Sequence, residues 1–129
     1  MLVMAPLIAG GAPPVAGRRP VRIDEARALV LRALKGSPAI RLRGFALEDI
    51  EGSSNKQFYV FEGQWNNPDA GSIVAGHYAV DAKTGDVWNA LACEEFTSHE
   101  LGKLQATIRK RIGLSDEEYR QLRRPGPGC

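Results

Sequence analysis

Apolar residues recur every three or four positions in two parts of the chain, which is the spacing of one face of an α-helix. The first part begins at Asp24, which we expect to cap a helix that runs to about Lys35 and ends before Gly36 and Pro38. Glu25 near its start suits the helix dipole. The apolar face consists of Ala26, Leu29, Val30, Ala33 and Leu34.

The second part lies near the C-terminus and predicts two helices in succession. Thr97 and Glu100 have the spacing of a capping box, and so do Ser115 and Glu118. Gly113, between the two boxes, is typical of a residue that ends a helix. The first of the two helices carries an apolar stripe made of Leu101, Leu104, Ile108 and Ile112.

Between these helices the pattern changes to alternation and to runs of aromatic and β-branched residues, which favour strands. Gly44 interrupts the first strand and predicts a β-bulge. Gly85 suits the left-handed position of a tight turn. The predicted strands cover residues 40–47, 57–65, 73–80 and 87–91, with turns at 52–55 and 81–86 and a polar loop at 66–71. This order predicts an α+β fold, in which an N-terminal helix packs on a four-stranded antiparallel meander and two C-terminal helices follow.

Residues 21–129 are expected to form a single α+β domain, because a chain of 129 residues with 43% hydrophobic content suffices for one core. Residues 1–20 are expected to be a signal-like or flexible N-terminal segment. Residues 1–17 carry no charge and resemble the apolar and small-residue parts of a secretory signal, without its positively charged start. The alternative is a tail broken by proline and glycine. The apolar run is too short for a stable membrane span.

The two cysteines, Cys93 and Cys129, help to predict the cellular compartment of the protein. An even number in an exported protein predicts a disulfide. A bond between these two would stabilise the fold by roughly 3 to 4 kcal/mol in the loop-entropy model. Two free thiols in a cytoplasmic protein are the alternative. We therefore expect the periplasm or export, with the cytoplasm as the other choice.

The formal net charge of +2 hides an asymmetry along the chain. Residues 44–100 contain two lysines and ten acidic residues, whereas both flanks are basic. Such an asymmetry can steer a charged partner. The alternative is that the flanks lie against the middle of the chain and offset its charge.

Few residues offer catalytic chemistry. His77 on a predicted strand and His99 in the first turn of a helix are expected to be structural or surface residues. Cys93 and His77 lack the local sequence of a thiol–imidazole pair, and the two Cys and two His lack the short paired spacings of a zinc site. A phosphate-binding glycine loop is absent, and the basic C-terminal cluster lacks interleaved aromatics. We predict a protein that is not an enzyme, needs no cofactor or metal, and does not bind nucleic acid.

One segment has a familiar pattern. Residues 78–87, with Tyr78, Val80, Asp81, Thr84 and Gly85 at the defining positions, resemble the hallmark hairpin of PepSY domains and related cystatin-like small bacterial proteins. That group includes some toxin immunity proteins, type VI secretion being one expected setting. The resemblance implies a protein that binds or inhibits another protein. An exported immunity protein against a cell-wall-active toxin is one implied role, and an accessory or structural envelope domain is the other.

We predict that binding uses the acidic middle of the chain, centred on the loop that follows the second strand. A half-exposed Trp can anchor an interface, and Pro68 stiffens the loop. The expected partner is another protein, such as a basic secreted toxin enzyme. The alternative is that Trp65 is a core residue and the loop a plain turn. The expected contact residues are Trp65, Asn66, Asn67, Asp69, Glu94 and Glu95.

Overall fold

The computed structural model describes residues 19–50, 57–69 and 71–128. The signal-like segment 1–17, the predicted turn 52–55 and Cys129 lie outside these residues, so the expectations placed on them stay predictions. Within the described residues the α+β class is confirmed.

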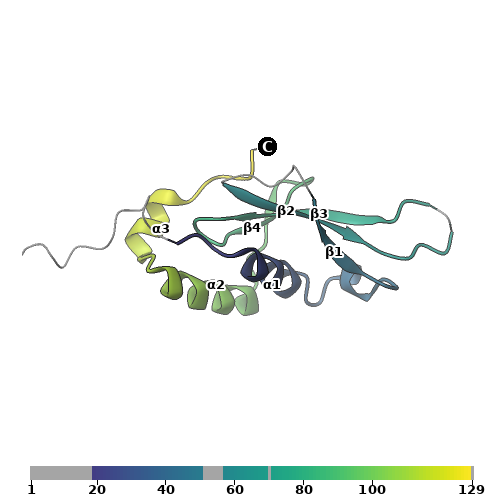
Figure 1. Cartoon of the computed structure of the whole chain (residues 1–129), viewed down its shortest axis with the longest axis horizontal. Coiled ribbons are helices and arrows are strands. Elements are labelled where there is room, and N and C mark those ends of the chain that lie inside the picture. The colour runs from purple at the N-terminus through teal and green to yellow at the C-terminus, as the bar shows by residue number, and fades with distance from the viewer. Residues whose placement is uncertain (1–18, 51–56, 70, 129) are drawn as a thin grey trace, which may run out of the picture.

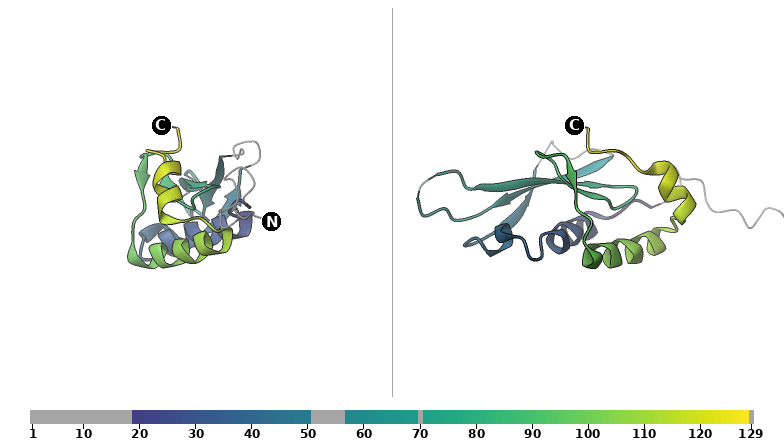
Figure 2. Two further views of the ribbon diagram at one scale, coloured as in Figure 1. Left: turned by 90° about the vertical axis from the view of Figure 1, so that its left-hand side faces the viewer. Right: turned by 180° about the vertical axis from the view of Figure 1, so that it is seen from behind.

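A five-stranded antiparallel sheet lies over the helices α1 and α2, which cover one of its faces (Figure 1). The strands follow one another in chain order, as expected for a meander, but the predicted number of four was too low by one short strand. The helix α3 lies at one end of the sheet (Figure 2). The elements are α1 (Ile23–Ala33), the 3₁₀ helix η3 (Pro38–Arg41), β1 (Ala46–Asp49), β2 (Phe58–Gln64), β3 (Val74–Asp81), β4 (Val87–Asn89), β5 (Glu94–Glu95), α2 (His99–Ile112) and α3 (Asp116–Leu122).

The first helix begins two residues earlier than expected. Arg22, not Asp24, is its N-cap, and the Arg22 backbone N–H donates a hydrogen bond to Glu25 Oε1 over 2.9 Å. Asp24 lies in the first turn instead, where its charge suits the positive end of the helix dipole. The helix buries the predicted apolar face, with Ala26, Leu29 and Val30 fully buried.

The helix η3 replaces the strand predicted at residues 40–43. Ser37 caps it through Oγ, which accepts a backbone hydrogen bond, and Pro38 occupies its first turn. Proline favours this position because its φ is already helical and it has no N–H to leave unpaired. Gly44 then adopts a φ of +67°, so it turns the chain and does not form the predicted bulge. The strand starts only at Ala46.

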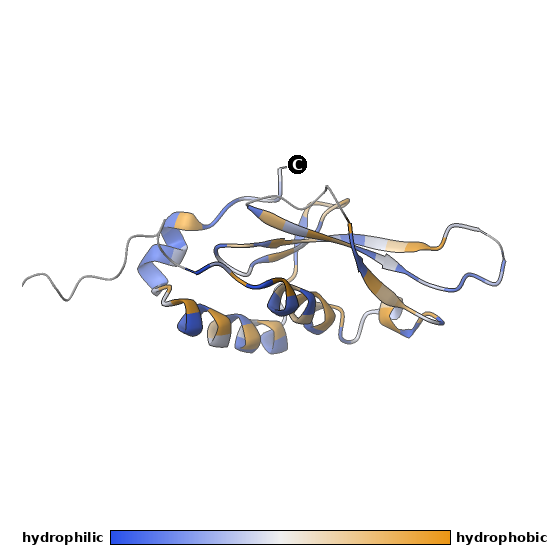
Figure 3. Cartoon of the chain, viewed as in Figure 1, coloured by the Kyte–Doolittle hydropathy of each residue, from blue (hydrophilic) through white to orange (hydrophobic). Residues whose placement is uncertain are grey.

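The inner face of the sheet packs on α1 and α2 and holds the main core. In the long β2–β3 pair, Phe61 lies opposite Tyr78 and Tyr59 opposite Val80. Alternate residues of the strands point to this face, as the period of a strand requires. Figure 3 shows apolar positions recurring along the helices and along the strands that they cover. The buried strand residues of this core are Leu47, Phe61, Tyr78, Val80 and Val87.

The two C-terminal helices follow the predicted pattern apart from one cap. Ser98, not Thr97, caps α2, and its Oγ accepts the Leu101 N–H at 3.2 Å, so the capping box expected at Thr97 and Glu100 is wrong. Gly113 ends the helix with a φ of +76°, as predicted. The capping box at Ser115 and Glu118 is confirmed. Leu101, Ile108 and Ile112 of the predicted stripe are buried.

The strand β4 ends at Asn89 and not at Leu91. Asn89 Oδ1 accepts the backbone N–H groups of Leu91 and Ala92, both at 3.1 Å, which turns the chain. Cys93 then takes a φ of +57°. This turn leads into β5, whose Glu95 pairs with Trp88 of β4.

A second, smaller core lies on the outer face of the sheet, beneath the C-terminal tail. Trp88 and Phe58 meet edge to face, with ring centroids 6.0 Å apart, and Ala79 packs against them. From the tail, the Arg124 guanidinium lies 5.5 Å from the centroid of the Phe58 ring, and its Nη1 donates to Gln57 Oε1 over 2.8 Å. The tail therefore covers this end of the outer face (Figure 2).

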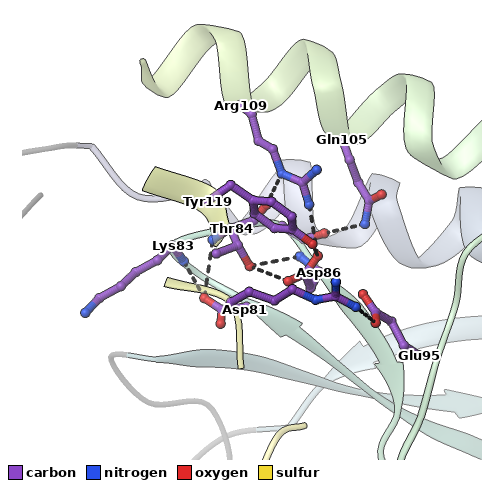
Figure 4. Close-up of polar contacts among 10 residues, drawn as sticks. Asp81, Lys83, Thr84, Asp86, Glu95, Gln105, Arg109 and Tyr119 are labelled. Atoms are coloured by element: carbon purple, nitrogen blue, oxygen red, sulfur yellow. Dashed lines mark hydrogen bonds and ion pairs between the residues drawn. The ribbon is translucent and has the colours of Figure 1, made fainter. Parts of the chain in front are cut away.

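The turn between β3 and β4 carries the residues that resemble the PepSY hairpin, and it is buried (Figure 4). Asp81 Oδ1 accepts the N–H groups of Lys83 at 2.8 Å and Thr84 at 3.3 Å. Thr84 Oγ1 donates to Asp86 Oδ2 over 3.0 Å. Gly85 has a φ of +78°, as predicted. The sequence pattern at this turn is thus explained by side chains that close it.

Both C-terminal helices bind the carboxylate of Asp86, which is 1% exposed (Figure 4). Arg109 Nη2 on α2 lies 2.9 Å from Asp86 Oδ1, and the Tyr119 hydroxyl on α3 donates to the same oxygen over 2.8 Å. Arg109 also donates from Nε to Thr84 O, and its guanidinium lies 3.9 Å from the centroid of the Tyr119 ring. These contacts fasten α2 and α3 to the β3–β4 turn.

Tyr119 is expected to make the protein less stable at alkaline pH. Burial and then the hydrogen bond to Asp86 raise the pKa of Tyr119 from its usual 10.0 to about 12. The fold favours the protonated phenol, so this contribution to the free energy of unfolding is complete below pH 10 and is lost as the pH rises through 12. Urea denaturation between pH 8 and 12 measures it, and Tyr119→Phe should lose less stability above pH 10 than the parent protein.

Tyr59 and Tyr78 are present in both the parent protein and Tyr119→Phe. Burial raises the pKa of each, so both proteins share the loss of stability that these two tyrosines cause at alkaline pH. Equal losses of stability in the parent and in Tyr119→Phe would contradict the assignment to Tyr119.

Candidate functional site

Part of the β2–β3 hairpin extends beyond the rest of the sheet (Figure 1). The strand β4 pairs only with Tyr78–Val80 of β3, so β3 residues 74–77 reach past it. On the other side, β1 pairs with residues 61–64 of β2. We call this region the distal hairpin. It consists of residues 46–49, 61–64 and 74–77, together with the described loop residues between Gln64 and Val74. Neither the helices nor the C-terminal tail covers its outer face (Figures 1 and 2).

Three side chains follow one another across the outer face of the distal hairpin. Glu48 on β1 lies opposite Glu62 on β2, and Glu62 lies opposite His77 on β3. Glu62 is held on both oxygens: Gln64 Nε2 donates to Oε1 over 2.7 Å, and His77 Nε2 lies 3.0 Å from Oε2. The hydrogen bond from Gln64, with that from His77, lowers the pKa of Glu62 below its usual value. Glu62 is therefore a fixed negative charge at neutral pH.

A groove of about 480 Å³ lies where this outer face meets the loop. Its wall combines one carboxylate, amide groups and one guanidinium with an indole ring and three further apolar side chains, a mixture that suits a protein partner. The groove is lined by Arg43, Gly44, Ala46, Glu48, Gln64, Trp65, Asn66, Asn67, Pro68 and Ile73.

Asparagines form hydrogen bonds within the described part of the loop beside the groove. The Asn66 N–H donates to Arg43 O over 2.7 Å, and a Cβ at Gly44 would collide with the Asn66 side chain. Asn67 Oδ1 accepts the Asp69 N–H at 2.9 Å, while Asn67 Nδ2 donates to Ser72 O over 3.0 Å. Residues that are already held by such hydrogen bonds lose less conformational entropy when they bind a partner.

The structure brings together most, but not all, of the residues expected to bind a partner. Trp65, Asn66 and Asn67 line the groove, and Asp69 is exposed further along the loop. Trp65 is half-buried, so it is neither the plain core residue of the alternative nor fully exposed.

Glu94 and Glu95 lie elsewhere, on β5 at the opposite edge of the sheet from β1. Glu95 Oε1 is bound by Arg123 Nη2 at 2.9 Å, so its charge is used to hold the tail. Glu94 is exposed. The structure therefore does not join this acidic pair to the groove.

The basic flank offsets the acidic middle only in part. Three of the ten acidic residues counted in residues 44–100 pair with arginines of the C-terminal flank, and all three lie away from the distal hairpin. These pairs are Asp81–Arg124, Asp86–Arg109 and Glu95–Arg123. Among the described residues, Glu48, Glu62 and Asp69 pair with no arginine or lysine. The negative charge of the middle segment therefore persists at the distal hairpin.

Sequence reasoning missed the groove residues outside the loop, and with them Glu48, Glu62 and Gln64 of the outer face. A signal was present, since Glu62 and Gln64 alternate with apolar neighbours and must share one face of a strand. His77 was expected to be a half-buried or a surface residue of a strand, and its side chain is 29% exposed with Nε2 lying 3.0 Å from Glu62 Oε2.

The remaining candidates for chemistry do not converge. His99 is exposed on the first turn of α2 and is not among the residues that line the groove. In the part of the chain that the structure describes, no group of three or more His, Cys, Asp and Glu residues could hold a metal ion. No helix among those residues is long and apolar enough to cross a membrane.

Comparisons with known proteins add a likeness of fold. No family model matches the chain, and no curated protein matches its sequence, so membership of the PepSY or cystatin-like groups is not confirmed. The fold is similar to that of a chain in the structure of a type VI secretion system effector–immunity complex from Pseudomonas protegens. The TM-score is 0.67 and the sequence identity 23%, over 84% of this chain and 91% of that chain.

Proposed function

We propose that this chain is an immunity-type protein, which binds a bacterial toxin and neutralises it by forming a complex without catalysis of its own. The observation that carries the proposal is the distal hairpin, which projects beyond the rest of the sheet. Its outer face is covered by no other described element, carries negative charge and continues into the groove. Trp65 offers the kind of aromatic anchor that dominates many interfaces. The similar fold of a chain from an effector–immunity complex supports a toxin as the partner class.

We further propose a toxin with a basic surface, acting on the cell wall, and a periplasmic location for this chain. Charge complementarity with the distal hairpin would speed association with such a toxin. The signal-like segment 1–17 and a Cys93–Cys129 disulfide would both fit an oxidising compartment. In support of the bond, Pro125, Gly126 and Gly128 line a hollow together with Cys93, which places the end of the described tail beside Cys93.

The test is rescue of growth by co-expression. The product of each gene neighbouring this one is expressed in a bacterial host, alone and with this chain, with both proteins directed to the periplasm or both to the cytoplasm. We expect one product to arrest growth and this chain to relieve the arrest, and the purified pair to elute together. Asp69→Lys should weaken protection while leaving thermal stability nearly unchanged, because the Asp69 side chain is exposed.

An accessory or structural envelope domain is the competing function. That function predicts that no toxic neighbour is neutralised by this chain in either compartment. Such a result would remove the immunity proposal.

A further inference from the structure

We propose that the outer face of the distal hairpin receives an arginine side chain of the partner, with its guanidinium between the carboxylates of Glu48 and Glu62. This inference rests on the proposed function, because it names the chemistry by which the same site recognises its partner. It starts from a sheet face that the helices and the tail leave uncovered, beside a groove that is partly apolar.

The register of the sheet places two like charges directly opposite each other. Glu48 and Glu62 are cross-strand partners on adjacent antiparallel strands, so their Cβ atoms are about 5 Å apart. Like charges in this arrangement destabilise a sheet. Elsewhere in the acidic segment, arginines offset Asp81, Asp86 and Glu95. Glu62 has partners within the fold, whereas no contact among the described residues offsets Glu48, and a cation bound between the two carboxylates would offset both.

The site is partly organised before the partner arrives. Glu62 is fixed by Gln64 on one side and His77 on the other. Glu48 is held by no hydrogen bond or ion pair among the described residues, and it is exposed. One fixed and one adjustable carboxylate can close on a cation with a small cost in entropy.

The groove favours arginine over lysine. Because Gln64 commits its Nε2 to Glu62, its carbonyl oxygen stays available as a further acceptor beside the two carboxylates. The Trp65 indole lines the same groove, and a planar guanidinium both stacks on aromatic rings and donates several hydrogen bonds in one plane. The apolar groove residues Pro68 and Ile73 can cover the chain next to the arginine.

The first test needs no toxin. N-acetyl-argininamide is titrated into the ¹⁵N-labelled protein, with the neutral N-acetyl-citrullinamide as a probe of the same shape. We expect saturable chemical-shift changes at Glu48, Glu62 and Gln64 with the arginine probe only, weakened at least about fivefold in Glu48→Gln. Equal shifts with citrulline, or shifts spread evenly over the acidic residues of α3, would overturn the proposal. This outcome does not depend on whether a toxin is found.

The second test uses the toxin that the rescue experiment identifies. Glu48→Gln should weaken binding at least about tenfold, which corresponds to ~1.4 kcal/mol, and should make binding less sensitive to salt. Glu94→Gln is the matched control, since it removes the same charge from an exposed strand residue at the opposite edge of the sheet. Equal losses in both variants would assign the effect to net charge and overturn the site.

Stability separates a binding role of Glu48 from a structural one. If Glu48 repels Glu62 in the free protein, Glu48→Gln should unfold at the same or a higher urea concentration than the parent. Weaker binding together with unchanged or raised stability is the expected combination. A clear loss of stability in Glu48→Gln would give the residue a structural role and contradict the proposal.

Discussion

Arg109→Ala should lower the free energy of unfolding by about 3 to 5 kcal/mol, because it leaves a buried carboxylate without its cation. Asp86 is buried and accepts hydrogen bonds from Arg109, Tyr119 and Thr84. The Arg109 side chain is itself 20% exposed, so most of the expected cost is that of Asp86 left unpaired. The same change also frees Thr84 O of its bond to Arg109 Nε.

Urea denaturation followed by circular dichroism measures this loss. Arg120→Ala is the control, since its ion pair with Glu117 is well exposed on both sides and should contribute less than about 1 kcal/mol. The double variant Asp86→Asn with Arg109→Met should recover part of the loss, because it removes both charges. A loss for Arg109→Ala no larger than that for Arg120→Ala would show that the network does not stabilise the fold.

The helices could be predicted from the sequence because their signals are local. The stripe containing Leu101 and Ile108, the cap at Ser115 and the stop at Gly113 each depend on residues within one or two turns. The errors at the helix starts were one or two residues. Glu25 closes the start of α1 by accepting the backbone N–H of Arg22, an arrangement that the search for a Ser, Thr, Asp or Asn cap overlooks.

The strands were predicted correctly where the sequence pattern defines both faces of the sheet. They were missed where contacts with other parts of the chain determine the local structure. The hairpin made of β2 and β3 has aromatic and β-branched residues on both faces and was predicted within one residue at all four strand ends. Ile40 to Arg43 alternates in the same way, yet Ser37 and Pro38 start a helical turn just before it. The strand β5 has two residues, Glu94 and Glu95, and no apolar pattern to reveal it.

The site could be predicted only in part, because it combines local and long-range structure. Trp65 and the asparagines of the loop have a local signal, and the structure places them on one groove. The contribution of Glu48 depends on which strand β1 pairs with and in which register, and neither is written in a short stretch of sequence. Glu95 was placed among the expected contact residues for its charge alone, and Arg123, 28 positions later in the chain, neutralises that charge.

The second largest effect is expected from Trp88→Ala, which should cost about 3 to 5 kcal/mol of the free energy of unfolding. Trp88 is 1% exposed, although it points to the outer face of the sheet, away from α1 and α2. Its burial depends on Phe58, which it meets edge to face, and on the tail that Arg124 fastens over this end of the sheet. Removing the indole therefore opens a cavity beneath the tail and weakens what holds the tail in place.

Leu91→Ala is the control for this prediction, since Leu91 follows the same strand but is 75% exposed and should change stability by less than about 0.5 kcal/mol. Trp88→Phe should lie between the two, because a phenyl ring fills part of the space and keeps a contact with Phe58. The measurement is urea denaturation, together with limited tryptic cleavage of the tail after Arg123. If the second core anchors the tail, Trp88→Ala should be cleaved there faster than the parent protein while Leu91→Ala is not. Unchanged cleavage in Trp88→Ala would mean that the ion pairs of Arg123 and Arg124 hold the tail without the tryptophan.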